Sequence, residues 1–108
     1  NRFRDLLSRG MELGAGSDSP ITTIDPLVGV AAFEAHHDPS QRLRREEAVR
    51  VFTLGSARLA HQEDKKGSLE PGKHADFAVY DVDPIDTLSL DAVRPVLTVS
   101  LGRDVYAT

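Results

Sequence analysis

Helical and extended hydrophobic patterns follow one another at the start of the chain. Phe3, Leu6 and Leu7 have the i, i+3, i+4 spacing of one helix face, and Gly10 follows as a stop signal. In residues 11–16, apolar side chains alternate with glutamate and glycine, which predicts a β-strand. A helix, a short turn and a strand make up half of a repeating α/β unit. We therefore expect an α/β arrangement in this part of the chain.

The middle of the chain has the pattern of three helices, predicted at residues 25–36, 44–52 and 53–60. Asp25 and Pro26 form a typical helix start, because a capping carboxylate is followed by proline at the first helical position. Thr53 is predicted to cap the third, short helix.

A β-hairpin is predicted in the next segment. Residues 75–82 are rich in Val, Phe, Tyr and Ala, which indicates a strand. Pro71 and Gly72 before it form a turn signal, since proline presets one turn dihedral and glycine accepts positive φ. Residues 68–70 are therefore the expected partner strand.

A second hairpin is predicted near the C-terminus. Apolar and polar residues alternate again in residues 96–101, which favours a strand. Gly102 and Arg103 are predicted to form a two-residue turn, and Val105 lies in the returning strand.

Composition excludes several classes of protein. The formal net charge of −4 gives no general attraction to nucleic acid or to an anionic membrane. No apolar run approaches the roughly 18 residues that a membrane span requires, and no signal peptide is visible. Cysteine is absent, which excludes disulfides and fits a reducing compartment. We expect a cytoplasmic protein without nucleic-acid or membrane partners.

Four short segments resemble a known enzyme family. The stretch GSLEPGKHADFAVYD at residues 67–81 resembles a signature near the C-terminus of metal-dependent amidohydrolases. GSDSP at 16–20, TLGSA at 53–57 and LGRDVY at 101–106 match in the same order. The chain is most similar to amidohydrolase family 3, of the N-substituted formamide deformylase type, and resembles a C-terminal fragment of such an enzyme.

The resemblance implies an α/β parent enzyme with two domains. Residues 1–61 would be the end of a TIM-barrel metal-dependent hydrolase domain, with the last β/α unit of the (β/α)8 barrel plus helices. Residues 62–108 would be the C-terminal part of a small composite β-sandwich domain. Because such a barrel needs roughly 250 residues and the first residue is Asn1, we expect the 108 residues to be a fragment.

Asp18 is the candidate catalytic residue. The resemblance assigns the aspartate of G-S-D to catalysis beside a divalent metal, zinc, in the full-length enzyme. There it would accept a proton from a metal-activated water and then protonate the leaving nitrogen. The resemblance also makes Asp18 a candidate ligand of the metal, together with ligands from sequence upstream of this chain. Asp-Ser-Pro is also common turn chemistry, so a plain turn is the alternative.

The histidines do not form a metal-binding pattern. His36, His37, His61 and His74 show neither H-x-H nor H-x-x-x-H spacing. Adjacent residues on a helix point about 100° apart, so His36 and His37 do not easily share one metal. We therefore expect no metal bound to this chain alone, and the resemblance places the ligands in sequence outside it.

The resemblance implies a hydrolase that cleaves C–N bonds in a small-molecule amide or formamide, with the fragment inactive alone. Two alternatives stay open: a non-catalytic α+β subunit-contact module, and a deaminase or cyclic amidohydrolase of the same superfamily. Strands without neighbours recruit other chains, so the 108 residues are expected to associate as a homodimer through exposed strands.

Overall fold

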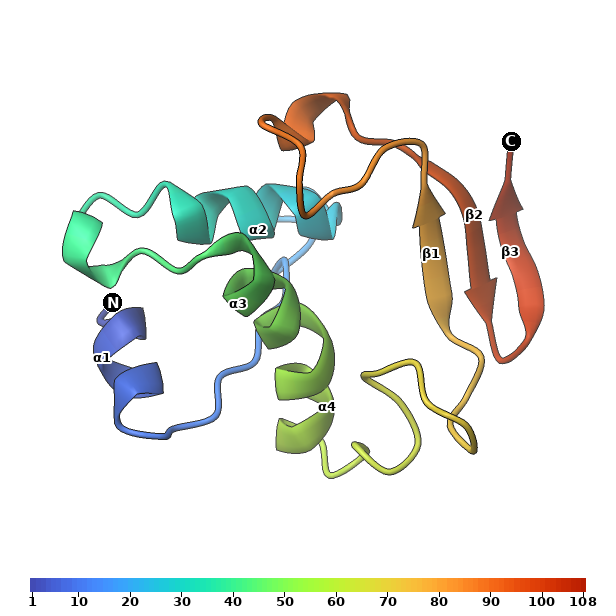
Figure 1. Ribbon diagram of the computed structural model, residues 1–108, viewed down its shortest axis with the longest axis horizontal. Coiled ribbons are helices and arrows are strands. Elements are labelled where there is room, and N and C mark those ends of the chain that lie inside the picture. Colours follow the sequence, from blue (N-terminus) through green and yellow to red (C-terminus); the bar gives the residue numbers. More distant parts are fainter.

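The computed structural model describes residues 1–108 as a group of helices beside a small antiparallel sheet (Figure 1). The helices are α1 (Phe3–Ser8), α2 (Pro26–Glu34), α3 (Arg45–Arg50) and α4 (Ser56–Leu59), and the strands are β1 (Phe77–Tyr80), β2 (Pro95–Ser100) and β3 (Arg103–Ala107). Short 3-10 helices lie at Pro39–Gln41 and Leu90–Ala92, and a π-helical turn lies at Val51–Gly55. No helix has the length and apolar character needed to cross a membrane.

The start of α2 confirms the helix signal in the sequence. The Asp25 carboxylate accepts a hydrogen bond from the Leu27 amide at 2.9 Å, and Pro26 occupies the first turn. Leu27 and Val30 form the buried face of the helix. The helix ends at Glu34, slightly before the predicted end near residue 36.

One helical segment replaces the two that were predicted for residues 44–60. The π-helical turn Val51–Gly55 joins α3 directly to α4, so the prediction of a new helix start at Thr53 is wrong. The Thr53 hydroxyl donates to the Val49 carbonyl at 2.8 Å, within its own helix, and caps nothing. Inside a helix, a threonine hydroxyl can donate to the carbonyl four residues earlier and need not cap a new helix.

Residues 11–16 form no β-ladder, so the predicted strand is not present in this chain. The segment lies beside α4, where Glu12 pairs with Arg58 at 3.0 Å. A strand needs a neighbouring strand to satisfy its backbone groups, and no other strand of these 108 residues reaches this position.

The sheet has the order β1-β2-β3, with both pairs antiparallel. The centre of the predicted strand 75–82 is confirmed as β1, but its partner is wrong: residues 68–70 are not a strand, and β1 pairs with β2. Phe77 lies opposite Val99. The local turn at Pro71-Gly72 therefore belongs to a loop, and the sheet is closed by a longer-range pairing.

The second hairpin forms, with its turn one residue earlier than predicted. Leu101 and Gly102 connect β2 to β3, with φ of 50° and 74°. Two-residue hairpins of the I′ type need positive φ at both central residues. The pattern located the hairpin but not the leucine in its left-handed conformation.

The main hydrophobic core lies among the helices and the segment before β2. Its buried members are Leu27, Val30, Leu43, Ala48, Val51, Leu90 and Val93. From the sheet, Tyr80 packs against this core. The helices and the sheet therefore share only a small part of one core.

Candidate functional site

Asp18 lies at the end of the extended segment that follows α1. Its side chain is exposed and makes no hydrogen bond or ion pair within the chain. Its φ is 55°, in the left-handed region, which few residues other than glycine adopt, although aspartate is more tolerant than most. The Asp18 carbonyl accepts from the Ile21 amide at 2.9 Å, so the residue opens a tight turn. An exposed, unpaired carboxylate is free to accept a proton from a bound molecule.

The segment before Asp18 is held by Ser56, the first residue of α4. The Ala15 amide donates to the Ser56 hydroxyl oxygen at 3.1 Å. The hydroxyl is also within donating distance of two carbonyl oxygens, that of Val51 at 2.9 Å and that of Ala15 at 3.2 Å. The backbone that leads to Asp18 is therefore hydrogen-bonded to the helix through Ser56, in addition to the Glu12–Arg58 ion pair.

Two glycines allow this close approach. A Cβ placed on Gly55 would lie 2.1 Å from the Leu13 carbonyl oxygen, and one on Gly14 would lie 2.8 Å from the Leu59 side chain. The glycines stand on the two sides of the contact between the extended segment and the helix. Gly55 and Ser56 belong to the TLGSA segment that carries part of the resemblance, but the hydrophobic pattern of the sequence gives no signal for this contact.

The four histidines are not brought together with Asp18 in a metal site. His36 and His37 stack on each other with ring centroids 4.4 Å apart, and His36 accepts the Asp38 amide at 3.0 Å. No group of three or more His, Cys, Asp or Glu side chains is arranged to hold a metal ion. The residues of this chain therefore do not fit a divalent metal by themselves.

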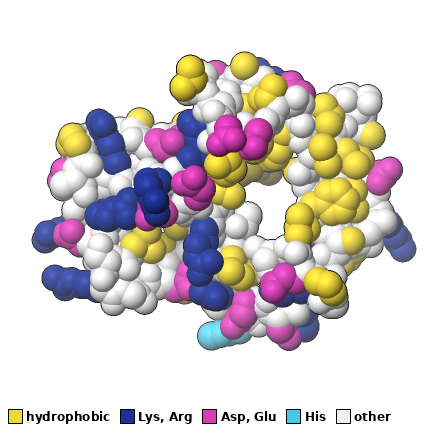
Figure 2. Space-filling model, viewed as in Figure 1, with side chains coloured by type: hydrophobic (Ala, Val, Ile, Leu, Met, Phe, Trp, Pro, Cys, Tyr) yellow, Lys and Arg dark blue, Asp and Glu magenta, His cyan; other side chains and the backbone are white.

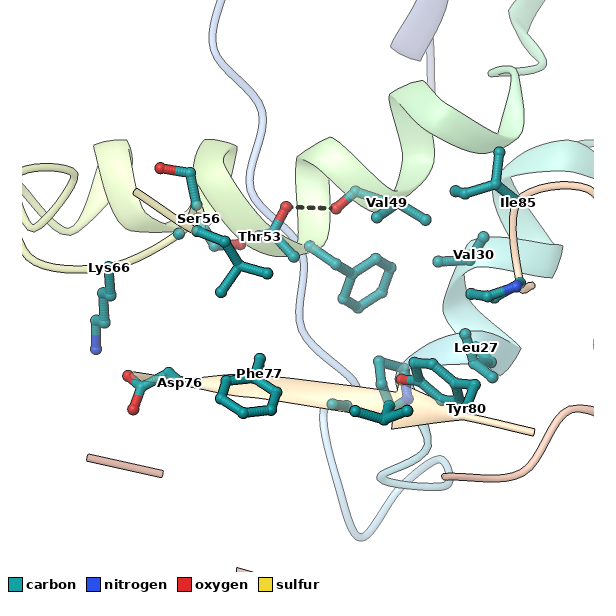
Figure 3. A pocket seen from close by; sticks show the side chains of 18 of the residues that line it. Leu27, Val30, Val49, Thr53, Ser56, Lys66, Asp76, Phe77, Tyr80 and Ile85 are labelled. Carbon is teal, nitrogen blue, oxygen red and sulfur yellow. Dashed lines mark hydrogen bonds between the residues drawn. The ribbon is translucent and has the colours of Figure 1, made fainter. Parts of the chain in front are cut away.

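A large apolar cavity separates the helices from β1. It has a volume of about 930 Å³, and 13 of its 22 lining residues are hydrophobic. Figure 2 shows the opening between the helical part and the sheet, with hydrophobic side chains on its rim. In Figure 3, Phe77 and Tyr80 of β1 face it from one side, and Val30 and Val49 lie opposite.

The unpaired edge of β1 lies along this cavity. All four residues of Phe77–Tyr80 line it, although successive side chains of a strand point to opposite faces. A space that touches both faces lies at the edge of the strand, and β1 has a neighbour only on its other side. β1 carries no charged residue, whereas β3, the other edge strand, carries Arg103 and Asp104. Charged residues are a usual protection of a free edge, so β1 is the unprotected one.

The surface of the chain is large for its mass. It exposes 7407 Å², whereas a compact monomer of 11.8 kDa exposes about 5,900 Å². The radius of gyration is 14.3 Å, against about 13 Å for a compact domain of this length. An open cavity increases both the exposed surface area and the radius of gyration, as observed.

The most strongly perturbed carboxyl group lies away from Asp18 and has a structural role. Glu47 receives two hydrogen bonds from Arg4, at 2.7 and 2.6 Å, and one from the Arg44 amide at 2.8 Å. The hydrogen bonds from Arg4 lower the pKa of Glu47 to about 2. They join α1 to the first turn of α3.

Tyr80 is the perturbed group beside the cavity. Burial raises its pKa, and the negative charge of Asp25 raises it further. A higher pKa keeps the phenol neutral, which suits a side chain packed against the core.

Several curated proteins are similar to this chain. The Bacillus subtilis protein named "Putative amidohydrolase YtcJ" is 33% identical over 116 residues, covering 96% of this chain and 22% of that protein. The N-substituted formamide deformylase of Arthrobacter pascens is 29% identical over 90 residues, covering 77% of this chain and 17% of the enzyme. The chain thus spans about a fifth of the length of these relatives.

Solved structures share the arrangement of the chain. An amidohydrolase from Thermotoga maritima superposes with a TM-score of 0.79 at 22% identity, over 98% of this chain and 26% of that one. An uncharacterized metal-dependent hydrolase from Pyrococcus furiosus has a TM-score of 0.70 at 40% identity, over 78% of this chain and 18% of that one. The model of the amidohydrolase family matches residues 1–106, and the chain therefore belongs to the amidohydrolase family, whose members include metal-dependent hydrolases.

Proposed function

We propose that this chain is the C-terminal portion of a metal-dependent hydrolase that cleaves a C–N bond in a small, non-peptide amide or formamide. Family membership supports hydrolysis, and similarity to an N-substituted formamide deformylase supports the substrate class. The chain supplies one acid–base group, Asp18, which takes a proton from the attacking water and delivers it to the leaving nitrogen.

The observation that carries this assignment is the state of Asp18. Its carboxylate is exposed and has no partner in the chain, while its backbone is held in a left-handed conformation. Sparsely populated backbone conformations persist where the surroundings maintain them, and they cluster at functional sites.

Metal binding is assigned to the remainder of the protein. The residues of this chain form no group that fits a divalent ion, and about four-fifths of the length of YtcJ lies outside the similarity. We assign zinc to that part on the family resemblance alone, and a chain of these 108 residues is expected to be inactive.

The same view accounts for the cavity beside β1. We assign residues 1–61 to the end of the barrel domain and residues 62–108 to the composite β-sandwich. An uncharged strand with an unpaired edge on an apolar space of about 930 Å³ is suited to receive a further strand of that sandwich.

The test is the substitution Asp18→Asn in the whole protein that carries this chain. Turnover of an N-substituted formamide, measured with a divalent metal present, should fall at least about 100-fold, which is the usual contribution of a positioned acid–base group. Asp86→Asn, at another exposed aspartate, is the matched control and should retain full turnover. Activity of the Asp18→Asn protein within about threefold of the unaltered protein would remove Asp18 from the mechanism.

A further inference from the structure

The hydroxyl of Ser56 makes the only side-chain hydrogen bonds to the backbone of the extended segment 11–16. We propose that Ser56 is a positioning residue, which fixes the backbone that carries Asp18; its relevance to catalysis rests on the proposed role of Asp18. It acts through the backbone and touches no reacting atom.

The hydrogen bonds of Ser56 can fix the position of the backbone at Ala15. It accepts from the Ala15 amide at 3.1 Å, and it lies within donating distance of the carbonyls of Val51, at 2.9 Å, and Ala15, at 3.2 Å. Both polar groups of Ala15 therefore lie within hydrogen-bond distance of one side chain, where a neighbouring strand would otherwise satisfy them. Because residues 11–16 have no strand neighbour in this chain, Ser56 takes over part of that role.

The π-helical turn explains why Ser56 faces the segment. Val51–Gly55 inserts a wider turn between α3 and α4, and such turns change the direction of the side chains that follow. Thr53, inside the same turn, is exposed and bonds only to its own helix. Gly55 lets the helix approach the Leu13 carbonyl closely enough for the Ser56 hydroxyl to reach Ala15.

Few rotatable backbone bonds separate Ala15, which is bound by Ser56, from Asp18. Only Gly16 and Ser17 intervene, and Ser17 is itself fixed by the turn. Its carbonyl accepts the Thr22 hydroxyl, and its own hydroxyl accepts the Ser19 amide at 3.2 Å. Displacement of Ala15 would therefore be transmitted through Gly16 to this turn, in which Asp18 is left-handed and its carbonyl accepts from the Ile21 amide.

Hydrogen exchange and NMR on the 108-residue chain test the proposal without any activity. In the unaltered chain the Ala15 amide should exchange at least about tenfold more slowly than the exposed Gly16 amide, since one hydrogen bond contributes roughly that factor. Ser56→Ala should remove this protection. It should also change the three-bond amide–Hα coupling of Asp18, which reports φ.

Thr53→Ala is the matched control, because it deletes a hydroxyl three residues away that contacts only its own helix. It should leave both the Ala15 exchange rate and the Asp18 coupling unchanged. If Ser56→Ala loses the helical circular dichroism, Ser56 supports the fold as a whole, and the positioning role is overturned.

The outcomes separate the possible failures. Equal exchange of Ala15 and Gly16 would show that Ser56 does not fix the backbone at Ala15. Loss of Ala15 protection with an unchanged Asp18 coupling would make Ser56 purely structural and overturn the positioning role. If both NMR effects occur but Asp18→Asn leaves turnover intact, the geometry stands and the proposed function fails.

Discussion

Replacement of Gly55 by alanine provides a direct test of the packing between the π-helical turn and the extended segment. Gly55 has helical φ and ψ of −60° and −47°, so alanine is compatible with its backbone conformation. Helix propensity alone favours alanine over glycine by about 1 kcal/mol. Against this, the added Cβ would lie 2.1 Å from the Leu13 carbonyl oxygen, a backbone atom that a side-chain rotation cannot move.

The overlap should outweigh the propensity. Overpacking in a well-packed site costs about 1–3 kcal/mol, and a clash with backbone belongs at the upper end. The expected net loss in the free energy of unfolding of Gly55→Ala is therefore about 2 kcal/mol. For a chain of this size this corresponds to a fall in Tm of about 8–16 °C.

Gly29→Ala is the matched control. Its Cβ would meet the Phe52 ring, with the nearest atom at 2.3 Å, but that ring lies at the apolar cavity and has space to move. The same propensity gain then remains, and the variant should be as stable as the unaltered chain or up to about 1 kcal/mol more stable.

Urea unfolding followed by circular dichroism at 222 nm measures both variants, with unchanged m-values required for the comparison. Gly55→Ala should have the lower midpoint and Gly29→Ala a midpoint at or above that of the unaltered chain. A Gly55→Ala protein that is as stable as Gly29→Ala would refute the close approach of the helix to Leu13.

Three further predictions concern the charges, the helix end and the sheet edge. Arg4 lowers the pKa of Glu47 to about 2, so the stability that the Glu47 carboxylate contributes to the fold is present above about pH 4.5 and is lost as the pH falls towards 2. In acid titrations the unaltered chain should therefore lose more stability over this interval than Glu47→Gln. Equal losses would contradict the pairing of Glu47 with Arg4. His61 has φ of 54° at the end of α4, where glycine is favoured, so His61→Gly should raise the unfolding free energy by about 1 kcal/mol, and a lower midpoint in urea would count against this. We propose that the isolated chain self-associates through β1 at micromolar concentration, so light scattering should show a dimer. Val79→Lys, on β1, should weaken this dimer, and Val105→Lys, on β3, should leave it intact. A monomer at every concentration would reject the proposal.

The sequence predicted those elements whose signals are local. The start of α2 followed from Asp25 and Pro26 because capping depends on neighbouring residues only. The position of β1 likewise followed from its composition. By contrast, its partner is β2, about twenty residues away, and no local pattern reports such a pairing.

Two of the wrong assignments, the helix start at Thr53 and the strand at residues 11–16, have a common physical cause. Thr53 and residues 11–16 each have a local signal that a tertiary contact overrides: the helix continues through Thr53, and the extended segment bonds to Ser56 in place of a strand. Gly55 and Ser56 belong to the TLGSA segment, but the sequence does not show their role, because it depends on which residue lies opposite.

The candidate site was predictable only in part. The resemblance pointed to Asp18, and the alternation of residues 11–16 placed it at the end of an extended segment. Its left-handed φ and its support by Ser56 could not be inferred from the pattern. Nor could the cavity, since its walls come from helices and a strand that are distant in sequence.

The separation of the sheet from the helical core has a consequence for how the molecule unfolds. Seven buried residues of the core come from the helices and the connecting segments, and none comes from β1, β2 or β3. The sheet can therefore open as a cooperative unit of lower stability while the helices remain folded. Both tyrosines, Tyr80 and Tyr106, lie in the sheet and tryptophan is absent, so tyrosine fluorescence should report this first step and helical circular dichroism the second.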